Sequence, residues 1–136
     1  MTRRDFQRLA DIRAREAAAL VRSRNYQGAY YLGGFAVECA LKACIAKKTR
    51  RYDFPDKIHT ARVHTHSLLE LLRVSDLNAR LELDMRTNPR LAANWGVVKV
   101  WSVDSRYQAD RLNGRDMVTA VSSLPDGVLE WIKQHW

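Results

Sequence analysis

The sequence predicts an all-α fold that occupies residues 1–136 as a single domain. Apolar residues recur at steps of three and four along most of the chain, which is the period of an amphipathic helix. Capping residues and prolines separate these segments, and no internal repeat or low-complexity segment divides the chain. Hydrophobic residues make up 46% and charged residues 28% of the sequence, so the composition is that of a globular domain and not of a disordered chain or a membrane protein.

The first helix is predicted over about residues 3–23 and carries much of the positive charge. The net charge of the chain is +8, which permits attraction to nucleic acid, nucleotides or an acidic protein. A solvated helix face and a phosphate-binding surface both fit this pattern, and an isolated charge run is more often a solvated face. The arginines of this segment are Arg3, Arg4, Arg8, Arg13, Arg15, Arg22 and Arg24.

The second helix is predicted over about residues 26–47 and is the most apolar segment. It contains Gly33 and Gly34, each of which weakens a helix by roughly 1 kcal/mol relative to alanine. We therefore expect another backbone to approach closely at these glycines. Glu38 and Lys42 are four residues apart and are placed to form an ion pair on one face.

A polar, basic loop is predicted over about residues 47–65, and a third helix begins near His66. Thr65 or Ser67 is the expected N-cap. Ser67 and Glu70 have the spacing of a capping box ahead of a leucine-rich run. Loops of this length are often functional.

Ser75 is expected to act as a second N-cap and to open a short helix over about residues 76–85. Pro89 closes that stretch, because proline lacks a backbone donor and disfavours helical geometry in the residue before it. A further short helix is favoured over a strand where apolar residues keep a roughly helical spacing, at Leu91, Trp95, Val98 and Trp101.

The last helix is predicted from about residue 115 to residue 135, with Asn113 or Gly114 as its cap. Its apolar residues keep steps of three and four on both sides of Pro125. The preserved phase favours one bent, continuous helix over two separate ones.

The amino-terminal residues 1–15 lack the uninterrupted apolar core of a secretory signal, so the protein is expected to stay in the cytoplasm. Cys39 and Cys44 are five residues apart on a predicted helix and point to different faces, so they cannot readily bridge each other. We expect both to be buried and reduced. Burial disfavours the thiolate and argues against a nucleophilic cysteine.

A first group of candidate functional residues lies in and after the predicted loop, where His59, His64 and His66 accompany Asp53 and Asp56. Imidazoles and carboxylates are zinc ligands, but the tight ligand pairs of a structural zinc site are missing. A solvated loop with imidazoles available to a partner is the favoured interpretation, and no metal is expected. The sequence also lacks a glycine-rich phosphate loop, a G-x-S-x-G elbow and an H-E-x-x-H motif.

A second group is Asp104, Ser105, Arg106 and Tyr107, which lies at a predicted helix boundary. Arginine binds phosphate with two parallel hydrogen bonds, and tyrosine stacks on a base or bonds a phosphate oxygen. Alternatively, an arginine such as Arg106, or a lysine, pairs with Glu38, because buried glutamate is rare unless paired.

The tryptophans are a third group. With basic residues nearby, they would suit a stacking platform for single-stranded nucleic acid. No sheet or barrel pattern accompanies them, so core or dimer contacts are the expected role. They are Trp95, Trp101, Trp131 and Trp136.

Taken in order, four segments are similar to the HEPN domain family. These are residues 26–32 (YQGAYYL), 35–43 (FAVECALKA), 64–72 (HTHSLLELL) and 105–107 (SRY). The alanine-rich E-x-x-L-K pattern is the most recognisable of them, and the set covers nearly the whole chain. The resemblance implies an up-and-down bundle of four to five helices that pairs into a homodimer.

Many HEPN proteins are metal-independent ribonucleases with an arginine and a histidine separated by four to six residues. This sequence departs from that motif. Arg51 and His59 have seven residues between them, and Arg62 and His66 have three. A ribonuclease with displaced residues would have to use His64 or His66 with Arg62 or Arg106, because a guanidinium and an imidazole must both reach the scissile phosphate.

The resemblance therefore points to the non-catalytic branch of the family. Its members are often partners of small nucleotidyltransferases in toxin and antitoxin pairs, or bind nucleotide-like ligands. By similarity, the expected ligand-binding residues are Glu38, Lys42, His66, Arg106 and Tyr107. No cofactor is expected, and a purely structural dimerisation module is a third interpretation.

Overall fold

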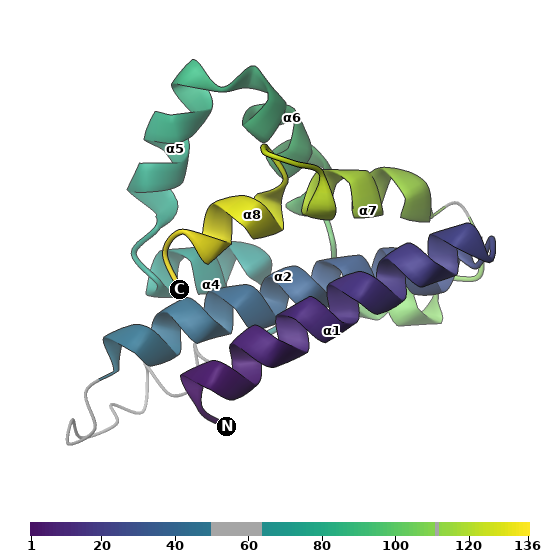
Figure 1. The fold of residues 1–136 in the computed structure, drawn as a ribbon, viewed down its shortest axis with the longest axis horizontal. Helices are drawn as coiled ribbons and strands as arrows, with labels where there is room; N and C mark the ends of the chain where they lie inside the picture. Colours follow the sequence, from purple (N-terminus) through teal and green to yellow (C-terminus); the bar gives the residue numbers. More distant parts are fainter. Residues whose placement is uncertain (50–63, 111) are drawn as a thin grey trace.

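Two long antiparallel helices, α1 (Arg3–Arg22) and α2 (Tyr26–Lys48), form the base of the fold (Figure 1). The computed structural model describes residues 1–49, 64–110 and 112–136, and all regular structure in these ranges is helical. The all-α class is thus confirmed for the described part of the chain. The bounds of these first two helices agree with the predicted ones to within one residue.

The capping of α1 follows directly from its sequence. The hydroxyl of Thr2 accepts from the backbone N–H of Asp5, and the Asp5 carboxylate accepts from the backbone N–H of Thr2 at 2.7 Å. This reciprocal box satisfies amide groups that the first turn leaves without partners. The fully buried residues of the helix are all alanines, whose small side chains allow close packing against the rest of the bundle: Ala10, Ala14 and Ala17.

Helix α2 is the core of the molecule, and most of the other elements pack on it. By length and hydropathy it also qualifies as a helix able to cross a membrane, but 67% of its most apolar window is buried inside the protein. Burial on several sides explains why the segment is apolar nearly all round. Its two cysteines, Cys39 and Cys44, are buried and free, as predicted.

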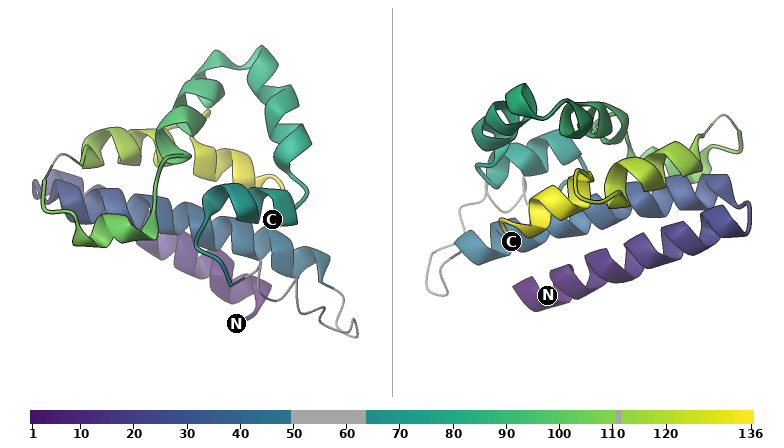
Figure 2. Two further views of the ribbon diagram at one scale, coloured as in Figure 1. Left: turned by 180° about the vertical axis from the view of Figure 1, so that it is seen from behind. Right: turned by 45° about the horizontal axis from the view of Figure 1, so that its top comes forward.

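The remaining helices lie over and around α2. They are α4 (Leu68–Val74), α5 (Asn78–Thr87), α6 (Pro89–Val98), the short 3-10 helix η1 (Val103–Tyr107), α7 (Gly114–Ser122) and α8 (Val128–Lys133). Helices α4, α7, α8 and η1 contact α2 directly, whereas α5 and α6 form a V-shaped pair at the top of the fold (Figure 1). Figure 2 shows η1 near the amino-terminal part of α2 and α4 near its carboxyl-terminal part.

The predicted role of Ser75 as an N-cap, and with it the predicted start of the next helix, is wrong. Ser75 does not open a helix but closes α4, because its hydroxyl donates to the backbone oxygen of Leu72 at 2.7 Å. The next helix begins at Asn78, after Asp76 takes a left-handed φ of 59°. Ser67 does cap α4, accepting from the backbone N–H of Glu70 at 3.3 Å.

The predicted continuous helix through Pro125 is also wrong. The chain leaves helical geometry at Ser123, where ψ is 146°, and α8 begins only after Gly127, where ψ is 149°. Pro125 has no backbone N–H to donate to the preceding turn, and it disfavours helical geometry at Leu124, so a continuous helix cannot pass through this segment. The side-chain amide of Asn94 in α6 holds the resulting turn by donating to the backbone oxygen of Asp126 at 2.9 Å.

The tryptophans are mainly core residues. Trp95, Trp101 and Trp131 are 6%, 4% and 5% exposed, and Trp136 is partly buried against the core. Trp95 lies within α6, as predicted, but Trp101 follows that helix in an irregular connection. Burial of three of the rings leaves no exposed tryptophan platform in the described part of the chain.

Candidate functional site

A buried carboxylate at the middle of α2 is the clearest polar feature of the core. Glu38 is 1% exposed and lies among apolar residues of its own helix and its neighbours. Removing a carboxylate from water costs free energy unless charged or hydrogen-bonding groups replace the water. The groups that contact Glu38 therefore determine whether its burial is stabilised and which atoms remain free to bind a ligand.

Two nitrogen atoms share one oxygen of this carboxylate. Lys42 Nζ, one helical turn along α2, lies 3.0 Å from Glu38 Oε1, and His66 Nδ1 lies 3.0 Å from the same oxygen. The predicted i, i+4 pair is thus present. His66 reaches it from the extended segment just before α4, a segment whose end is fixed by the cap at Ser67.

The three side chains differ in how far they reach solvent. The side chain of Glu38 is 2% exposed, that of Lys42 is 13% exposed and that of His66 is 54% exposed. An ionised carboxylate only accepts hydrogen bonds, so the hydrogen of the shared bond belongs to His66 Nδ1. The orientation of the imidazole is therefore fixed by a buried group, while much of the ring stays accessible to a ligand.

The cluster of Glu38, Lys42 and His66 has unused bonding capacity. Glu38 Oε2 is buried and has no hydrogen-bond partner among the residues that the structure describes. An ammonium group has three donors, and only the bond to Glu38 is observed for Lys42 among the described residues. Glu38 and Lys42 form an ion pair of opposite charges.

Arg106 and Tyr107 do not join this cluster. Trp101 packs on Gly34, and the side-chain amide of Gln27 donates to the backbone oxygen of Ala109 at 2.9 Å. The chain from residue 101 to residue 109 therefore runs toward the amino-terminal end of α2, away from Glu38 (Figure 2).

The alternative in which Arg106 pairs with Glu38 is consequently not observed in the described part of the chain. Arg106 instead lies over the ring of Tyr107, with its guanidinium carbon 4.9 Å from the ring centre. Both side chains are exposed, and Tyr107 is 77% exposed. They form a separate cation and aromatic pair on η1, where Ser102 caps the first turn by accepting from the backbone N–H of Asp104.

The remaining predicted residues divide into exposed and undescribed ones. His64 is exposed and lies just before the segment that carries His66. Arg62, His59, Asp53 and Asp56 lie outside the described residues. Among those that are described, no group of three histidine, cysteine, aspartate or glutamate side chains is placed to hold a metal ion.

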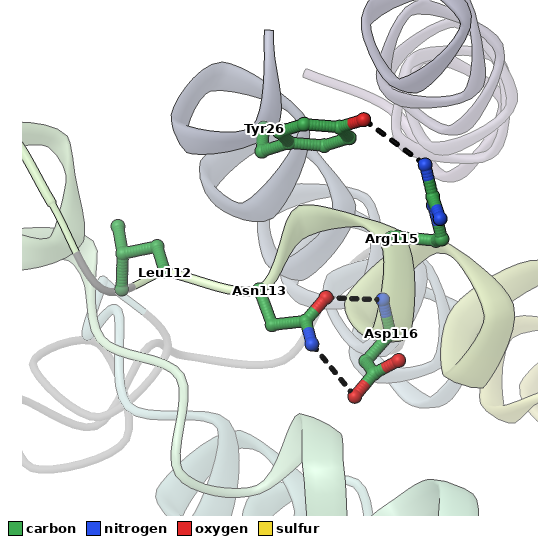
Figure 3. Close-up of a pocket in the computed structure, with 5 residues that line it drawn as sticks. All are labelled: Tyr26, Leu112, Asn113, Arg115 and Asp116. Carbon is green, nitrogen blue, oxygen red and sulfur yellow. Dashed lines mark hydrogen bonds between the residues drawn. The ribbon is translucent and has the colours of Figure 1, made fainter. Parts of the chain in front are cut away.

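The structure also shows a surface pocket that the sequence did not reveal, at the start of α2 and α7 (Figure 3). Arg115 donates to the hydroxyl of Tyr26 at 3.0 Å, across 89 positions of sequence. Asn113 caps α7 by accepting from the backbone N–H of Asp116 at 2.9 Å and donates to its carboxylate at 2.9 Å. Asn113 was one of the two predicted caps, but no sequence pattern links residues 26 and 115.

The charges in this pocket nearly balance, because Arg115 and Asp116 carry opposite signs. The backbone N–H of Asp116 already donates to the side-chain oxygen of Asn113. The pocket therefore offers an arginine and a phenol as contacts but no free cluster of donors.

Against models of protein families, against curated proteins and against solved structures, the chain has no match.

Proposed function

We propose that this protein is a HEPN-like binding module that holds a nucleotide or another phosphate-bearing ligand at Glu38, Lys42 and His66. In this proposal it acts as a homodimer and as the non-catalytic partner of a small nucleotidyltransferase. The resemblance of four sequence segments to the HEPN family supports the biological setting. The buried cluster on α2 supports the site.

The observation that carries the proposal is the shared carboxylate oxygen of Glu38. A glutamate that is 1% exposed is retained at a cost in free energy, and here it holds a lysine and a histidine in fixed positions. Fixed donors bind an anion with less loss of side-chain entropy than mobile ones. The remaining hydrogens of Lys42 and the exposed part of His66 are suited to phosphate oxygens.

Arg106 and Tyr107 take a different role in this proposal from the one predicted. They lie near the amino-terminal half of α2, whereas Lys42 and His66 lie toward its other end. A ligand that contacts both pairs must extend along α2, with its phosphate at the cluster and an aromatic group near the exposed ring of Tyr107. A nucleotide has both groups, and base stacking on an aromatic ring is sequence-tolerant.

Ligand binding is tested with purified protein and a panel of nucleoside mono-, di- and triphosphates, using thermal melting and calorimetry. We expect a ligand to raise the melting temperature and His66→Gln to weaken its binding by about tenfold or more, since a charge-assisted hydrogen bond contributes about 1.5–3 kcal/mol. His64→Gln, which changes an exposed histidine two residues away, is the matched control. Equal binding by both variants would remove the cluster from the site.

Arg106→Ala tests the proposed second contact, with Arg86→Ala on α5 as its control. We expect weaker binding of nucleotides by the first variant only, with inorganic phosphate affected less. Partner binding is tested by co-expression with a small nucleotidyltransferase and by the mass of the purified species in solution. A monomer that binds neither a nucleotide nor such an enzyme would contradict the whole proposal.

A ribonuclease with displaced residues is the second candidate, because the Glu38–His66 contact is of a kind that orients a general base. A carboxylate on one imidazole nitrogen leaves the other nitrogen free to accept a proton. Lys42 would then stabilise negative charge on the phosphate. Labelled RNA left intact, or cut equally well by His66→Ala, would exclude this candidate.

A further inference from the structure

The outward side of α1 carries a line of arginines that the proposed ligand site does not use. Arg4, Arg8, Arg15 and Arg22 are all exposed. Helix α1 lies beside α2 at one side of the bundle (Figure 2), and its fully buried residues are alanines. The charged line is therefore on a surface left uncovered by the rest of the described chain.

The spacing of these four residues places them on a single stripe. They are separated by four, seven and seven positions, and at 3.6 residues per turn they lie within about 40° of one another around the helix. The stripe is about 27 Å long, with steps of about 6, 10.5 and 10.5 Å along the axis. We name these four residues the arginine stripe.

The cations of the arginine stripe have no ion-pair partner among the described residues. The acidic residues beside them are engaged elsewhere: Asp11 lies 2.7 Å from the ammonium of Lys133. Hydrogen bonds from the backbone and side chain of Thr2 lower the pKa of Asp5, with a smaller contribution from Arg8. Arg13 is off the stripe and pairs with Glu16.

A groove between α1 and α8 runs beside the middle of the arginine stripe. Arg8 and Arg15 line one side of it, and Lys133 lies on the other with Asp11 and Glu130. Lys133 is bonded to both of these carboxylates, at 2.7 and 3.6 Å. The two arginines therefore remain the groups available to an incoming anion.

From this arrangement we infer that the arginine stripe binds the phosphate backbone of a nucleic acid. Unpaired like charges held in a row repel one another and are stabilised by a polyanion that releases its counterions on binding. Contacts of this kind position a nucleic acid without reading its sequence.

The composition of the surface favours nucleic acid over a protein. Protein interfaces depend on buried aromatic or aliphatic anchors, and no large apolar side chain of α1 is among the exposed ones. A membrane surface is disfavoured as well, because the apolar side of α1 is packed on α2 and cannot insert. The same repulsion between arginines argues against this face as the contact between two copies of the chain.

The test is fluorescence anisotropy with the full chain and labelled single-stranded RNA, duplex RNA and duplex DNA at several salt concentrations. The stripe variant replaces Arg4, Arg8, Arg15 and Arg22 by glutamine, which keeps helix propensity. We expect its affinity to fall by at least about tenfold, with the salt slope reduced by about 0.7–0.9 for each arginine engaged. The comparison of the three probes identifies which nucleic acid is bound.

The matched control replaces four exposed cations outside α1 by glutamine, so that both variants have the same net charge. These are Arg73, Arg86, Arg90 and Lys99. Circular dichroism melting verifies that each variant is folded. An equal loss of affinity in the control, no binding by the unmodified protein near 0.1 M salt, or equally tight binding of poly-glutamate or anionic vesicles would overturn the inference. None of these outcomes tests the proposed nucleotide binding at Glu38, which is measured separately.

Discussion

The indole ring of Trp101 lies directly on Gly34 of α2. Three of its ring atoms occupy the space that a β-carbon at position 34 would need. This contact joins the connection after α6 to the central helix, and the ring also stacks with Tyr31 at 6.1 Å between centres. The glycine thus has a packing role that outweighs its cost in a helix.

Gly34→Ala is expected to destabilise the protein by about 1–3 kcal/mol. A methyl group would displace a buried ring, and such overpacking exceeds the roughly 1 kcal/mol that alanine gains in helix propensity. Urea unfolding followed by circular dichroism measures the change.

Gly96→Ala on α6 is the control, because a β-carbon there meets no atom within 4 Å. We expect this variant to be more stable by about 0.5–1 kcal/mol. A Gly34→Ala variant that is more stable than the unmodified protein, or as stable as Gly96→Ala, would contradict the packing argument.

Lys42→Met is expected to cost about 3–5 kcal/mol of stability, because it leaves the buried Glu38 carboxylate without its ammonium partner. The methionine keeps most of the volume and apolar surface of the lysine stem. Chemical denaturation of the variant and the unmodified protein measures the loss.

The double variant Glu38→Leu with Lys42→Met separates charge from packing. Replacing both members of a buried pair by apolar residues of similar volume is often neutral or stabilising. We therefore expect the double variant to recover most of the stability that Lys42→Met loses. A double variant less stable than either single one would show that Glu38 stabilises the fold mainly through other contacts.

The helices that local sequence patterns define were predictable. The side chains of four residues accept a backbone hydrogen bond at a helix start: Thr2, Ser67, Asn88 and Asn113. Ser67 and Asn113 were each one of two caps that the sequence predicted for that helix. The contact between Glu38 and Lys42 was predictable for the same reason, since it lies within one helical turn. Local hydrogen bonding leaves a local signal.

Two of the errors concern the residues at which a helix begins or ends. Serine is a residue type typical of N-caps, but the hydroxyl of Ser75 donates to the backbone oxygen of Leu72 and ends the preceding helix. The phase of apolar residues around Pro125 is kept because Val121 and Val128 are both buried, although they belong to different helices. An apolar period records which residues face the core and does not record whether the backbone is continuous.

The position of Arg106, by contrast, is set by contacts between residues far apart in the sequence. Gly34 was expected to face a backbone, but it receives Trp101, which directs the following residues toward Gln27 and away from Glu38. Its neighbour Gly33 likewise faces a side chain, that of Met117 in α7. The direction of an irregular connection has no periodic signal in the sequence.

Both cysteines are expected to be inert toward thiol reagents in the folded protein. Burial raises the pKa of Cys39 to about 12 and that of Cys44 to about 11, with the charge of Glu38 adding to the effect at Cys39. At pH 8 the reactive thiolate is therefore scarce in the native state. Reaction with a chromogenic disulfide should require unfolding, and its rate should rise sharply with urea. Rapid modification of either thiol without denaturant would contradict the buried positions.

His135 is expected to make the protein less stable in mild acid. The centre of its ring lies 4.6 Å from that of Trp131, and its Nε2 is buried with no hydrogen-bond partner in the described part of the chain. Burial lowers the pKa of His135 below the usual histidine value of 6.5, with Arg80 adding to the effect and Asp84 opposing it. The unfolded chain then binds this proton more readily than the native one.

The contribution of His135 to stability is therefore complete above about pH 6.5 and decreases as the pH falls toward its native pKa. His135→Phe keeps a ring against Trp131 and removes the titrating group, so we expect its free energy of unfolding to vary less between pH 7 and pH 5. Urea unfolding at a series of pH values measures this slope. His64→Gln, which removes an exposed histidine, should leave the slope unchanged, and a steeper slope in His135→Phe would show that its imidazolium is stabilised in the native state.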